Sequence, residues 1–486
     1  MAARRGDVTV TALSRVPGEP APRPGVVHLG VGAFHRAHQA VYTDRAMAAT
    51  GDPRWGIVEV APRSADVVAA LRRQDGLYTV LERSGGRVTA NVVGSVAEAW
   101  HAPSDWAAVA ARFADPAVTV VTLTITEKGY LADPVTGALL DDDAVRADVA
   151  AVAAGERPRT GLGLLVGGLR RRMAAGAGAV TVLSCDNLVG NGARLGALVG
   201  EFAARLPGAL GPELTAWLAA SARFPSAMVD RIVPASTPAD RADALRLTGA
   251  ADDAVVAAEP FTQWVIEDDF AGERPAWELA GAELVADVGP HETAKLRVLN
   301  AAHSMIAYLG ALAGHETIAA AVADPPIRAA VAALHRDVLA TIEAPPGWDL
   351  PSYAASVLER FANPALGHRC DQVAADGSQK LPVRVLPTIL AARAAGRPSA
   401  AATLVVAAWL RFVLAGRSDD GRPLTVNDPA RDALRGVLPS DVARVLRAAA
   451  VAPEELAADA AWVADVARYL DELARHGAAA TAGELS

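Results

Sequence analysis

The chain is poor in cysteine. Its 486 residues include only two, Cys185 and Cys370, and neither belongs to a pair with metal-ligand spacing. Disulfide frameworks and cysteine-based zinc sites both need several cysteines at short intervals. We therefore expect neither of them. This sparing use of cysteine is typical of a reducing compartment, which indicates a cytoplasmic protein.

Long apolar runs are also absent. No stretch reaches the roughly 18 uncharged apolar residues that a membrane-spanning helix needs. The first residues include Arg4 and Arg5, but no apolar run follows them, so we expect no signal peptide. A membrane partner is therefore not expected.

Positive charge is scarce as well. The formal net charge is -9, and the most concentrated basic run, residues 170–172, is short and has no aromatic neighbours. A nucleic-acid interface needs a larger basic patch, so this run is better explained as a solvated helix end. We expect a small-molecule substrate, no nucleic acid, and a monomer whose own domains bury a large core.

The sequence is instead rich in buried-strand patterns. A chain of this length exceeds one ordinary core, so two or three domains are expected. In the first half, short β-branched runs alternate with alanine-rich helical stretches; the runs are residues 26–29, 55–60, 117–125 and 179–184. Near-continuously apolar strands separated by helices are typical of a parallel sheet covered on both faces. The predicted class is a doubly wound α/β fold.

The second half has a different pattern. From about Lys295 onward helical periodicity dominates, and β-branched strands become rare. The clearest predicted helices cover residues 296–312, 326–342 and 442–449. We therefore predict an α/β domain over residues 1–286 and a mostly α-helical domain over residues 287–486.

A glycine pair marks a candidate nucleotide site. Gly30 and Gly32 follow the first predicted strand and precede a predicted helix at 35–47. Glycines there let the backbone approach a pyrophosphate at a helix N-terminus, where free N–H groups favour anions. His35 stands where the third fingerprint glycine would be, so a plain strand–turn–helix is the alternative. The strand context favours a dinucleotide.

The end of the second strand bears on the choice of cofactor. An acidic residue there would hydrogen-bond the ribose hydroxyls of NAD. This strand end has no carboxylate beyond Glu59, and Arg63 follows shortly afterwards. NADP therefore remains open beside NAD, although Arg63 could equally be an exposed loop residue.

Four polar residues share one face of a predicted helix. At about 3.6 residues per turn, Glu292, Lys295, Asn300 and His303 fall on one side. Burying such groups is costly without a reason. Lys295 would act as general acid/base, Asn300 would donate to a developing oxyanion, His303 would orient substrate or lysine, and Glu292 would pass protons to solvent. The alternative is a surface stripe.

Two asparagines follow the fourth predicted strand. Carboxyl ends of strands form the binding crevice in doubly wound folds. Asn187 and Asn191 could therefore contact nicotinamide or the substrate oxygen. An ordinary Asn-Gly turn, formed by Asn191 and Gly192, explains the same residues equally well.

Together these segments resemble the mannitol dehydrogenase family of long-chain polyol dehydrogenases and reductases. The matching residues are 30–39, 126–130, 184–187, 191–192, 224–231, 263–270, 376–380, and Lys295 with Asn300 and His303. They occur in order along the chain, and the Lys-x4-Asn-x2-His spacing is the family's catalytic signature. That spacing argues against a surface stripe.

The resemblance implies a Rossmann-type domain, a helical domain, a cleft between them and no metal. It implies Lys295 as catalytic acid/base, Asn191 and Asn300 on the substrate oxygen, and Asp230 and His303 in the substrate site. NAD is the family's common cofactor. The residues expected to bind it are Gly30, Gly32, Phe34, His35, Arg36, Glu127, Lys128 and Asn187.

Within the family, residues 263–277 and 368–382 look more like those of fructuronate reductases. A hexuronate carries a carboxylate, which Arg369 or Lys380 could pair with, although either could be structural. We therefore expect reduction of fructuronate to mannonate. Mannitol 2-dehydrogenase or arabinitol dehydrogenase activity is the alternative. From other classes, a non-redox hexuronate epimerase and a cofactor-binding sensor remain. The intact residues Lys295, Asn191, Asn300 and His303 argue against a sensor.

Overall fold

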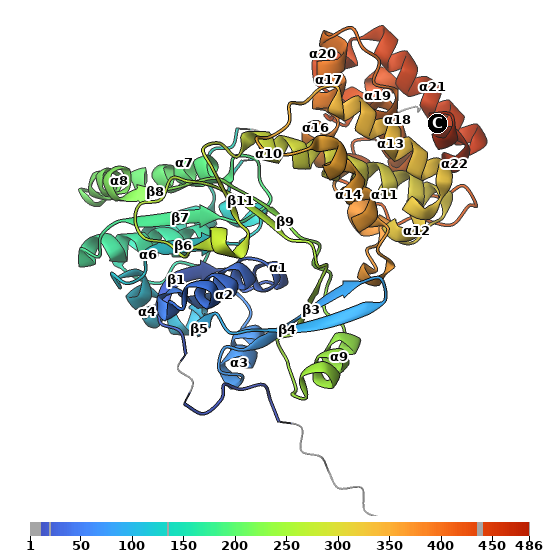
Figure 1. The fold of residues 1–486 in the computed structure, drawn as a ribbon. Coiled ribbons are helices and arrows are strands. Elements are labelled where there is room, and N and C mark those ends of the chain that lie inside the picture. Colours follow the sequence, from blue (N-terminus) through green and yellow to red (C-terminus); the bar gives the residue numbers. More distant parts are fainter. Residues whose placement is uncertain (1–10, 19–20, 134–135, 435–440, 486) are drawn as a thin grey trace, which may run out of the picture. The chain divides into compact units, whose positions relative to one another are not determined.

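The computed structural model describes residues 11–18, 21–133, 136–434 and 441–485. The chain divides into two compact units, Met1–Gly289 and Pro290–Ser486. The division falls close to the boundary expected from the sequence. In Figure 1, unit 1 runs from blue to yellow-green, and unit 2 from yellow to red.

Unit 1 contains a parallel sheet of six strands in the order β5-β2-β1-β6-β7-β8. The strands are β1 (Pro24–Leu29), β2 (Gly56–Ala61), β5 (Val96–His101), β6 (Val120–Leu123), β7 (Val180–Ser184) and β8 (Ala222–Arg223). The chain starts in the middle, proceeds to one edge, and returns to the middle to build the other half. The strand order therefore reverses between β1 and β6, and ligands bind at such a point in open α/β sheets.

Both faces of this sheet are buried, which confirms the doubly wound class. Successive side chains of a strand point to opposite faces. Val27 and Leu29 of β1 join one apolar core, whereas Val26 joins the other. The helices and helical turns of unit 1 are α1 (Ala33–Ala37), α2 (Gln39–Thr50), η1 (Pro53–Trp55), α3 (Asp66–Arg73), α4 (Ala102–Phe113), η2 (Glu127–Tyr130), α5 (Asp143–Ala154), α6 (Gly161–Ala175), α7 (Asn191–Ala204), α8 (Leu210–Ser221), α9 (Pro238–Thr248) and η3 (Trp277–Ala280).

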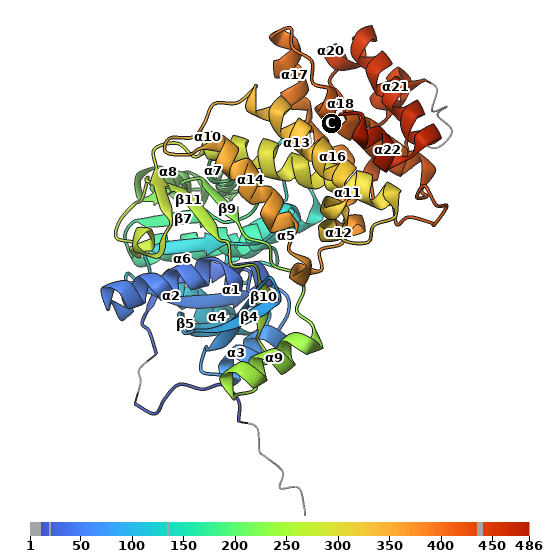
Figure 2. The ribbon, with the colours of Figure 1, turned by 45° about the vertical axis from the view of Figure 1, so that its right-hand side comes forward.

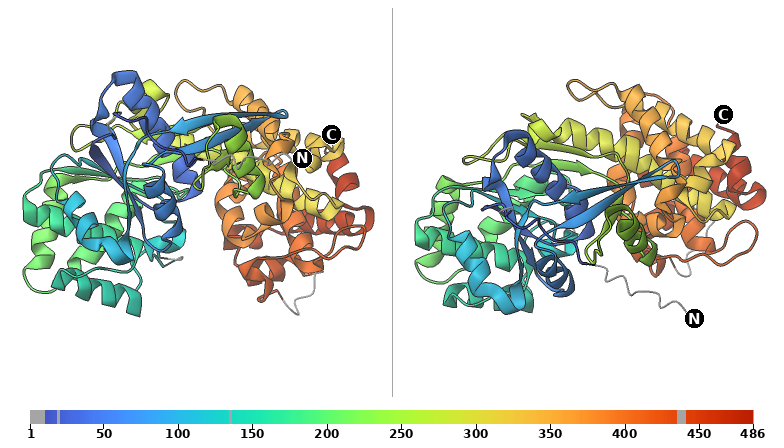
Figure 3. Two further views of the ribbon diagram at one scale, coloured as in Figure 1. Left: turned by 90° about the horizontal axis from the view of Figure 1, so that it is seen from below. Right: turned by 60° about the horizontal axis from the view of Figure 1, so that its bottom comes forward.

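Two small sheets complete unit 1, and the sequence patterns did not predict them. One has the order β10-β3-β4, and the other β12-β11-β9. Their strands are β3 (Tyr78–Ser84), β4 (Arg87–Val93), β9 (Ala227–Asp230), β10 (Val256–Ala258), β11 (Gln263–Glu267) and β12 (Glu283–Val285). The β3–β4 hairpin is the long pair of blue arrows in Figure 3.

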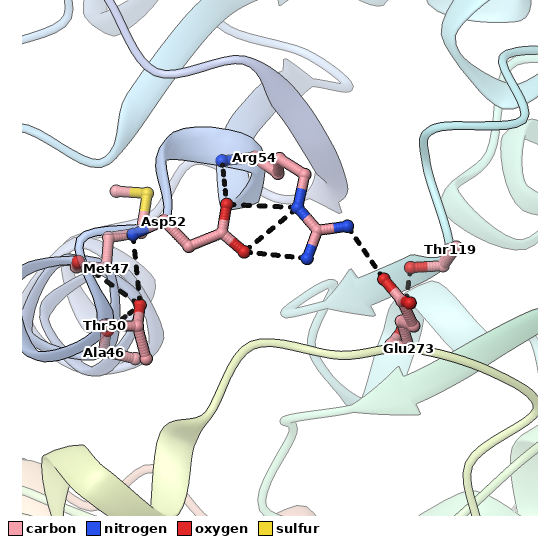
Figure 4. Close-up of polar contacts among 7 residues, drawn as sticks. All are labelled: Ala46, Met47, Thr50, Asp52, Arg54, Thr119 and Glu273. Carbon is pink, nitrogen blue, oxygen red and sulfur yellow. Dashed lines mark hydrogen bonds and ion pairs between the residues drawn. The ribbon is translucent and has the colours of Figure 1, made fainter.

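An arginine ties a distant loop to the amino-terminal edge of the six-stranded sheet (Figure 4). Arg54 pairs with Asp52 at 2.9 Å and with Glu273 at 2.9 Å. Thr119, just before β6, donates from Oγ1 to the carbonyl of Glu273 at 2.8 Å. These contacts fix the loop at residue 273 on the edge opposite the carboxyl ends of the strands.

Unit 2 is helical. Its elements are α10 (Gly289–Ala294), η4 (Lys295–Asn300), α11 (Ala301–Ala313), α12 (Ile318–Ala323), α13 (Pro325–Leu339), α14 (Leu350–Phe361), η5 (Pro364–Leu366), α15 (Cys370–Ala374), α16 (Gly377–Arg384), α17 (Leu386–Ala394), α18 (Ala400–Ala415), η6 (Pro429–Arg431), α19 (Val442–Ala448), α20 (Glu454–Ala457), α21 (Ala460–His476) and α22 (Ala478–Gly483). Nearly all of α11 and α18 is buried in one apolar core, against which α13 and α21 also pack (Figure 2).

The predicted helices and strands need three corrections. The helix expected at 35–47 is broken at His38 into α1 and α2. The strand expected at 117–125 is only β6. The helix expected at 296–312 starts as a π-helix, η4. Within the part of the chain that the structure describes, no helix combines the length and apolarity needed to cross a membrane.

Candidate functional site

A cavity of about 400 Å³ lies in unit 1 at the carboxyl ends of β1, β2 and β6. Gly30, Gly32, Arg63, Thr124 and Lys128 are among its lining residues. This is the edge where the strand order reverses, the expected place for a dinucleotide in such a sheet. The predicted glycine pair, the Arg63 loop and the predicted Lys128 therefore meet at one cavity.

The two glycines have different roles. Gly30 has a φ of +112°, and a Cβ there would lie 2.1 Å from the carbonyl oxygen of Thr124. Only glycine tolerates both conditions, so Gly30 shapes the turn. A Cβ on Gly32 would meet nothing within 4 Å. The backbone in front of Gly32 is therefore open to a close ligand, which fits a pyrophosphate.

A buried polar group supports this turn from behind. His28 contacts the carbonyl of Gly30 through Nε2 at 2.8 Å, and its ring stacks on that of His35 at 3.3 Å between centroids. His35 Nε2 lies 2.8 Å from Glu59 Oε1, and none of these three side chains is exposed. Burial lowers the pKa of His35 to about 3 and raises the pKa of Glu59 to about 7. The His35 ring is therefore neutral near pH 7, and a large share of Glu59 is protonated.

The same group brings three metal-ligand side chains within 4.8 Å of one another: His28, His35 and Glu59. Their geometry does not suit a metal ion. An imidazole lone pair lies in the plane of its ring, and the two stacked rings are only 12° from parallel. One ion cannot lie in both planes, and His28 already engages both of its nitrogens.

Three predicted cofactor residues lie elsewhere than expected. His35 is fully buried, Arg36 donates to the carbonyl of Ala254, and Phe34 stacks on His38 at 5.0 Å. Among the described residues that line the cavity, none of the three occurs. His35 and Arg36 point into the interior because α1 buries this side. Neither side chain lines the cavity, and the predicted contribution of His35 and Arg36 to cofactor binding stays a prediction.

The loop after β6 carries the other predicted cofactor residues. Lys128 lines the cavity, whereas the neighbouring Glu127 is exposed. Asp186 holds this loop by accepting from the backbone N–H groups of Ile125 at 3.0 Å and Thr126 at 2.9 Å. The sequence analysis missed this role of Asp186, because a long-range carboxylate–backbone contact leaves no periodic signal.

Asn191 is held more firmly than predicted. Its Nδ2 donates to the carbonyls of Asp186 at 3.0 Å and Ala227 at 2.7 Å, and its Oδ1 accepts from the N–H of Ala227 at 2.9 Å. Both amide hydrogens thus bond backbone carbonyls in this structure, and the predicted contact of Asn191 with the substrate oxygen stays a prediction. Asn187 is exposed after β7, and Asp230 is buried at the end of β9.

In unit 2 the predicted catalytic face begins in a π-helix. Lys295 and Asn300 are the first and last residues of η4. The i→i+5 hydrogen bonds of a π-helix place residues five apart nearly one above the other, and such segments are frequent at functional sites. Lys295 and Asn300 are therefore better aligned than an α-helix would allow. Glu292 lies in α10, just before this segment, and is buried.

A second helix supports the π-helix. His335 of α13 makes a 3.2 Å hydrogen bond through Nε2 to the carbonyl of Val298, in the middle of η4. Burial lowers the pKa of His335 to about 4, so the ring is neutral and can donate to this carbonyl. The sequence analysis did not identify His335.

Several buried polar atoms on or near this helix have no partner among the described residues. Asn300 Nδ2, His303 Nε2 and His368 Nδ1 make no hydrogen bond with any described residue. Native proteins rarely leave such atoms unsatisfied, and functional sites are a common explanation. His303 stacks on Phe361 at 4.6 Å, and burial lowers its pKa well below the usual value. A neutral imidazole is thus positioned for a ligand.

Two cations of α16 lie near this group. Lys380 and Arg384 are four residues apart and thus share a face of the helix, which packs against η4. Lys380 Nζ donates to the carbonyls of Val373 and Ala375 at 3.4 and 2.5 Å. Arg384 Nη1 donates to Ser304 Oγ at 3.2 Å. Both cations lower the pKa of His303, although burial is the larger cause.

Arg369 does not join these cations. Its backbone is extended and bridges Thr317, so it and the preceding His368 point to opposite sides. The ring of His368 lies 4.9 Å from that of His303, whereas Arg369 pairs with Asp371 at 3.0 Å and lines a separate cavity. The carboxylate contact predicted for Arg369 is therefore not supported.

Comparison with known proteins agrees with this geometry. The family model described as mannitol dehydrogenase Rossmann domain matches residues 24–279, and mannitol dehydrogenase C-terminal domain matches residues 287–474. D-mannonate oxidoreductase of Escherichia coli (strain K12) is 42% identical over 412 residues, covering 83% of this chain and 82% of that protein.

Two solved structures are similar over nearly the whole chain. Pseudomonas fluorescens mannitol 2-dehydrogenase, in ternary complex with NAD and D-mannitol, has a TM-score of 0.82 at 35% identity, covering 96% of this chain and 94% of that one. Substrate-free D-sorbitol dehydrogenase has a TM-score of 0.84 at 32% identity, covering 99% and 100%. The chain therefore belongs to the mannitol dehydrogenase family and is an oxidoreductase of that family.

Proposed function

We propose that the protein is an NAD(P)H-dependent reductase that converts fructuronate to mannonate and catalyses the reverse oxidation. The observation that carries this proposal is the pair of buried, unpartnered atoms Asn300 Nδ2 and His303 Nε2 on the helix that begins at Lys295. A D-mannonate oxidoreductase at 42% identity supports the choice of substrate.

The reaction needs a hydride at the carbonyl carbon and a proton at its oxygen. A bound nicotinamide supplies the hydride. Lys295 Nζ gives the proton in the reductive direction and recovers it through Glu292, as a general acid/base. Asn300 Nδ2 donates to the same oxygen while negative charge develops there. His303 Nε2 contacts a neighbouring hydroxyl and so fixes the orientation of the chain of the sugar.

The cofactor belongs to the cavity of unit 1. Gly32 leaves room for the pyrophosphate, and Arg63 lines the cavity after β2, where ribose hydroxyls are recognised. Because Glu59 is buried against His35, this strand end offers no carboxylate to exclude a 2′-phosphate. NADPH is therefore a candidate cofactor beside NADH.

The proposal is tested by following NADH and NADPH absorbance with the purified protein. Fructuronate, fructose and tagaturonate serve as oxidants, and mannitol and arabinitol are assayed in reverse. Cofactor oxidation with fructuronate alone supports the proposal. Stoichiometric change of bulk absorbance also separates a reductase from an epimerase, which returns its cofactor to the starting state.

A second candidate is mannitol 2-dehydrogenase activity. It is favoured by the similarity to the Pseudomonas fluorescens enzyme, which extends over 96% of this chain. Activity with fructose and mannitol but not with fructuronate would establish it instead. The same residues would carry that reaction, since only the group beyond the reacting carbons differs.

A further inference from the structure

We propose that Arg384 is the receptor for the substrate's carboxylate and that it selects sugar acids over neutral polyols. This inference rests on the proposed function, because it concerns the substrate class of the same site. Arg384 ends α16, the helix that packs against the π-helix carrying Lys295 and Asn300.

The position of Arg384 relates it directly to the catalytic helix. Nη1 donates to Ser304 Oγ at 3.2 Å and approaches the carbonyl oxygen of Asn300 at 3.5 Å. Ser304 is the residue after His303. The guanidinium thus lies beside the segment whose Asn300 and His303 side chains have buried atoms without partners.

The charge of Arg384 is not balanced. Within the described chain, no carboxylate forms an ion pair with it. Burial lowers the pKa of Arg384 to about 10, which reflects the cost of removing this cation from water. A largely desolvated cation without a carboxylate partner favours an anionic ligand as its complement.

Its hydrogen-bonding capacity is also largely unused. A guanidinium carries five N–H donors in a planar fork that matches a carboxylate in bidentate geometry. The contacts of Arg384 with described residues engage Nη1 alone. The Nε and Nη2 edge is free, and the residue is partly exposed. A ligand carboxylate can therefore receive two parallel hydrogen bonds.

The other cations nearby are less suitable. Lys380 already donates to two carbonyls at the end of α15, so its ammonium is anchored. Arg369 is paired with Asp371 and lines another cavity. Lys380 adds positive potential on the same face of α16, whereas Arg384 provides the directional contact.

The test compares kcat/KM for fructuronate and fructose in the wild type, Arg384→Gln and Arg384→Lys. Losing a desolvated charge pair should lower kcat/KM for fructuronate on the order of 100-fold, mainly through KM, with fructose turnover nearly unchanged. Arg384→Lys, which keeps the charge but not the fork, should fall between. Arg411→Gln removes another partly buried arginine of unit 2. It should leave kcat/KM unchanged for both fructuronate and fructose.

Several outcomes would overturn the inference. One is an Arg384→Gln enzyme that loses activity equally with both substrates, which indicates a structural role. Another is an Arg369→Gln enzyme that shows the selective loss instead. If Arg384→Gln does not fold, Arg384→Lys provides the test. Its preference for fructuronate over fructose in kcat/KM should still be lower than that of the wild type.

A binding experiment distinguishes failure of the proposed reaction from failure of the carboxylate receptor. If the wild type does not reduce fructuronate, binding of mannonate and of mannitol is measured by calorimetry with NAD present. Mannonate binding that Arg384→Gln weakens and Arg411→Gln leaves intact would support the carboxylate receptor without that reaction. Mannonate binding that is absent, or equal in the wild type and Arg384→Gln, would overturn the receptor as well.

Discussion

The imidazole of His35 and the carboxyl of Glu59 lie 2.8 Å apart in the interior of unit 1, and neither side chain is exposed. Glu59 is the last acidic residue of β2, close to the position where a carboxylate would recognise ribose. Its side chain points instead to His35 of α1. The pair supports the Gly30 turn through His28, which stacks on His35.

Replacement of Glu59 tests whether its carboxyl supports the Gly30 turn or recognises the ribose of the cofactor. Glu59→Gln keeps a hydrogen-bonding group beside His35, so we expect the free energy of unfolding to change by less than about 1 kcal/mol. Glu59→Ala leaves His35 without its partner and should cost about 1–3 kcal/mol. NADH affinity should be nearly unchanged in Glu59→Gln. Urea unfolding and fluorescence titration measure both quantities, and a tenfold loss of NADH affinity without loss of stability would contradict the structural role.

The two glycines of the nucleotide turn should respond differently to alanine. At Gly30 a Cβ would collide with the Thr124 carbonyl, and φ is +112°. Gly30→Ala should therefore lower the stability by more than about 1 kcal/mol, since this conformation strains any other residue. At Gly32 there is space for a methyl group, so Gly32→Ala should fold normally but bind cofactor at least about tenfold less tightly.

Thermal unfolding and NADH titration of both variants provide the comparison. The glycines serve as controls for each other, because they are two residues apart in one turn. Unchanged cofactor affinity in a stable Gly32→Ala protein would mean that the pyrophosphate does not approach this backbone.

Much of the fold could be predicted because its signal is local. The strands β1, β2 and β7 are short, nearly continuous apolar or β-branched runs, and each is buried along almost its whole length. The break at His38 could not be predicted, and the side chain of His38 there bonds the carbonyl of Gln263, which is distant in the sequence. The small sheets of unit 1 likewise depend on long-range pairing.

The catalytic helix was predicted from spacing, but its geometry was not. An α-helical wheel places Lys295, Asn300 and His303 on one broad face, whereas the π-helix brings the first two closer together. No local sequence pattern predicts a π-helix. Arg384 was missed for a related reason: its importance depends on which helix packs against η4, and a single sequence does not provide that.

Lys295→Ala tests the acid/base assignment. Removal of a positioned proton donor should lower kcat by about 10² to 10⁴, while NADH affinity changes little because the nucleotide cavity belongs to unit 1. Steady-state kinetics and NADH titration measure the two effects. Loss of NADH binding, with kcat preserved at saturation, would contradict the assignment. Lys128→Ala is the matched control, since Lys128 lines the nucleotide cavity and should affect cofactor affinity instead.

His335 links the stability of unit 2 to pH. Its pKa is lowered by burial from 6.5 to about 4. Between these values the unfolded chain binds a proton on His335 and the folded protein does not. Stability must therefore rise with pH across this window, be fully present above about 6.5, and be lost as pH falls.

Replacing His335 should remove this dependence. The pKa difference predicts that stability at about pH 5 is lower than at about pH 7.5 by about 2 kcal/mol through this residue. His335→Gln cannot titrate but keeps a donor for the Val298 carbonyl, so the difference between the two pH values should shrink by that amount. Other buried histidines, such as His28 and His303, contribute their own slope equally to both proteins. Urea unfolding at both pH values gives the comparison. An unchanged difference would mean that His335 also takes up its proton in the folded state, and the neutral donor to the π-helix would then have to be abandoned.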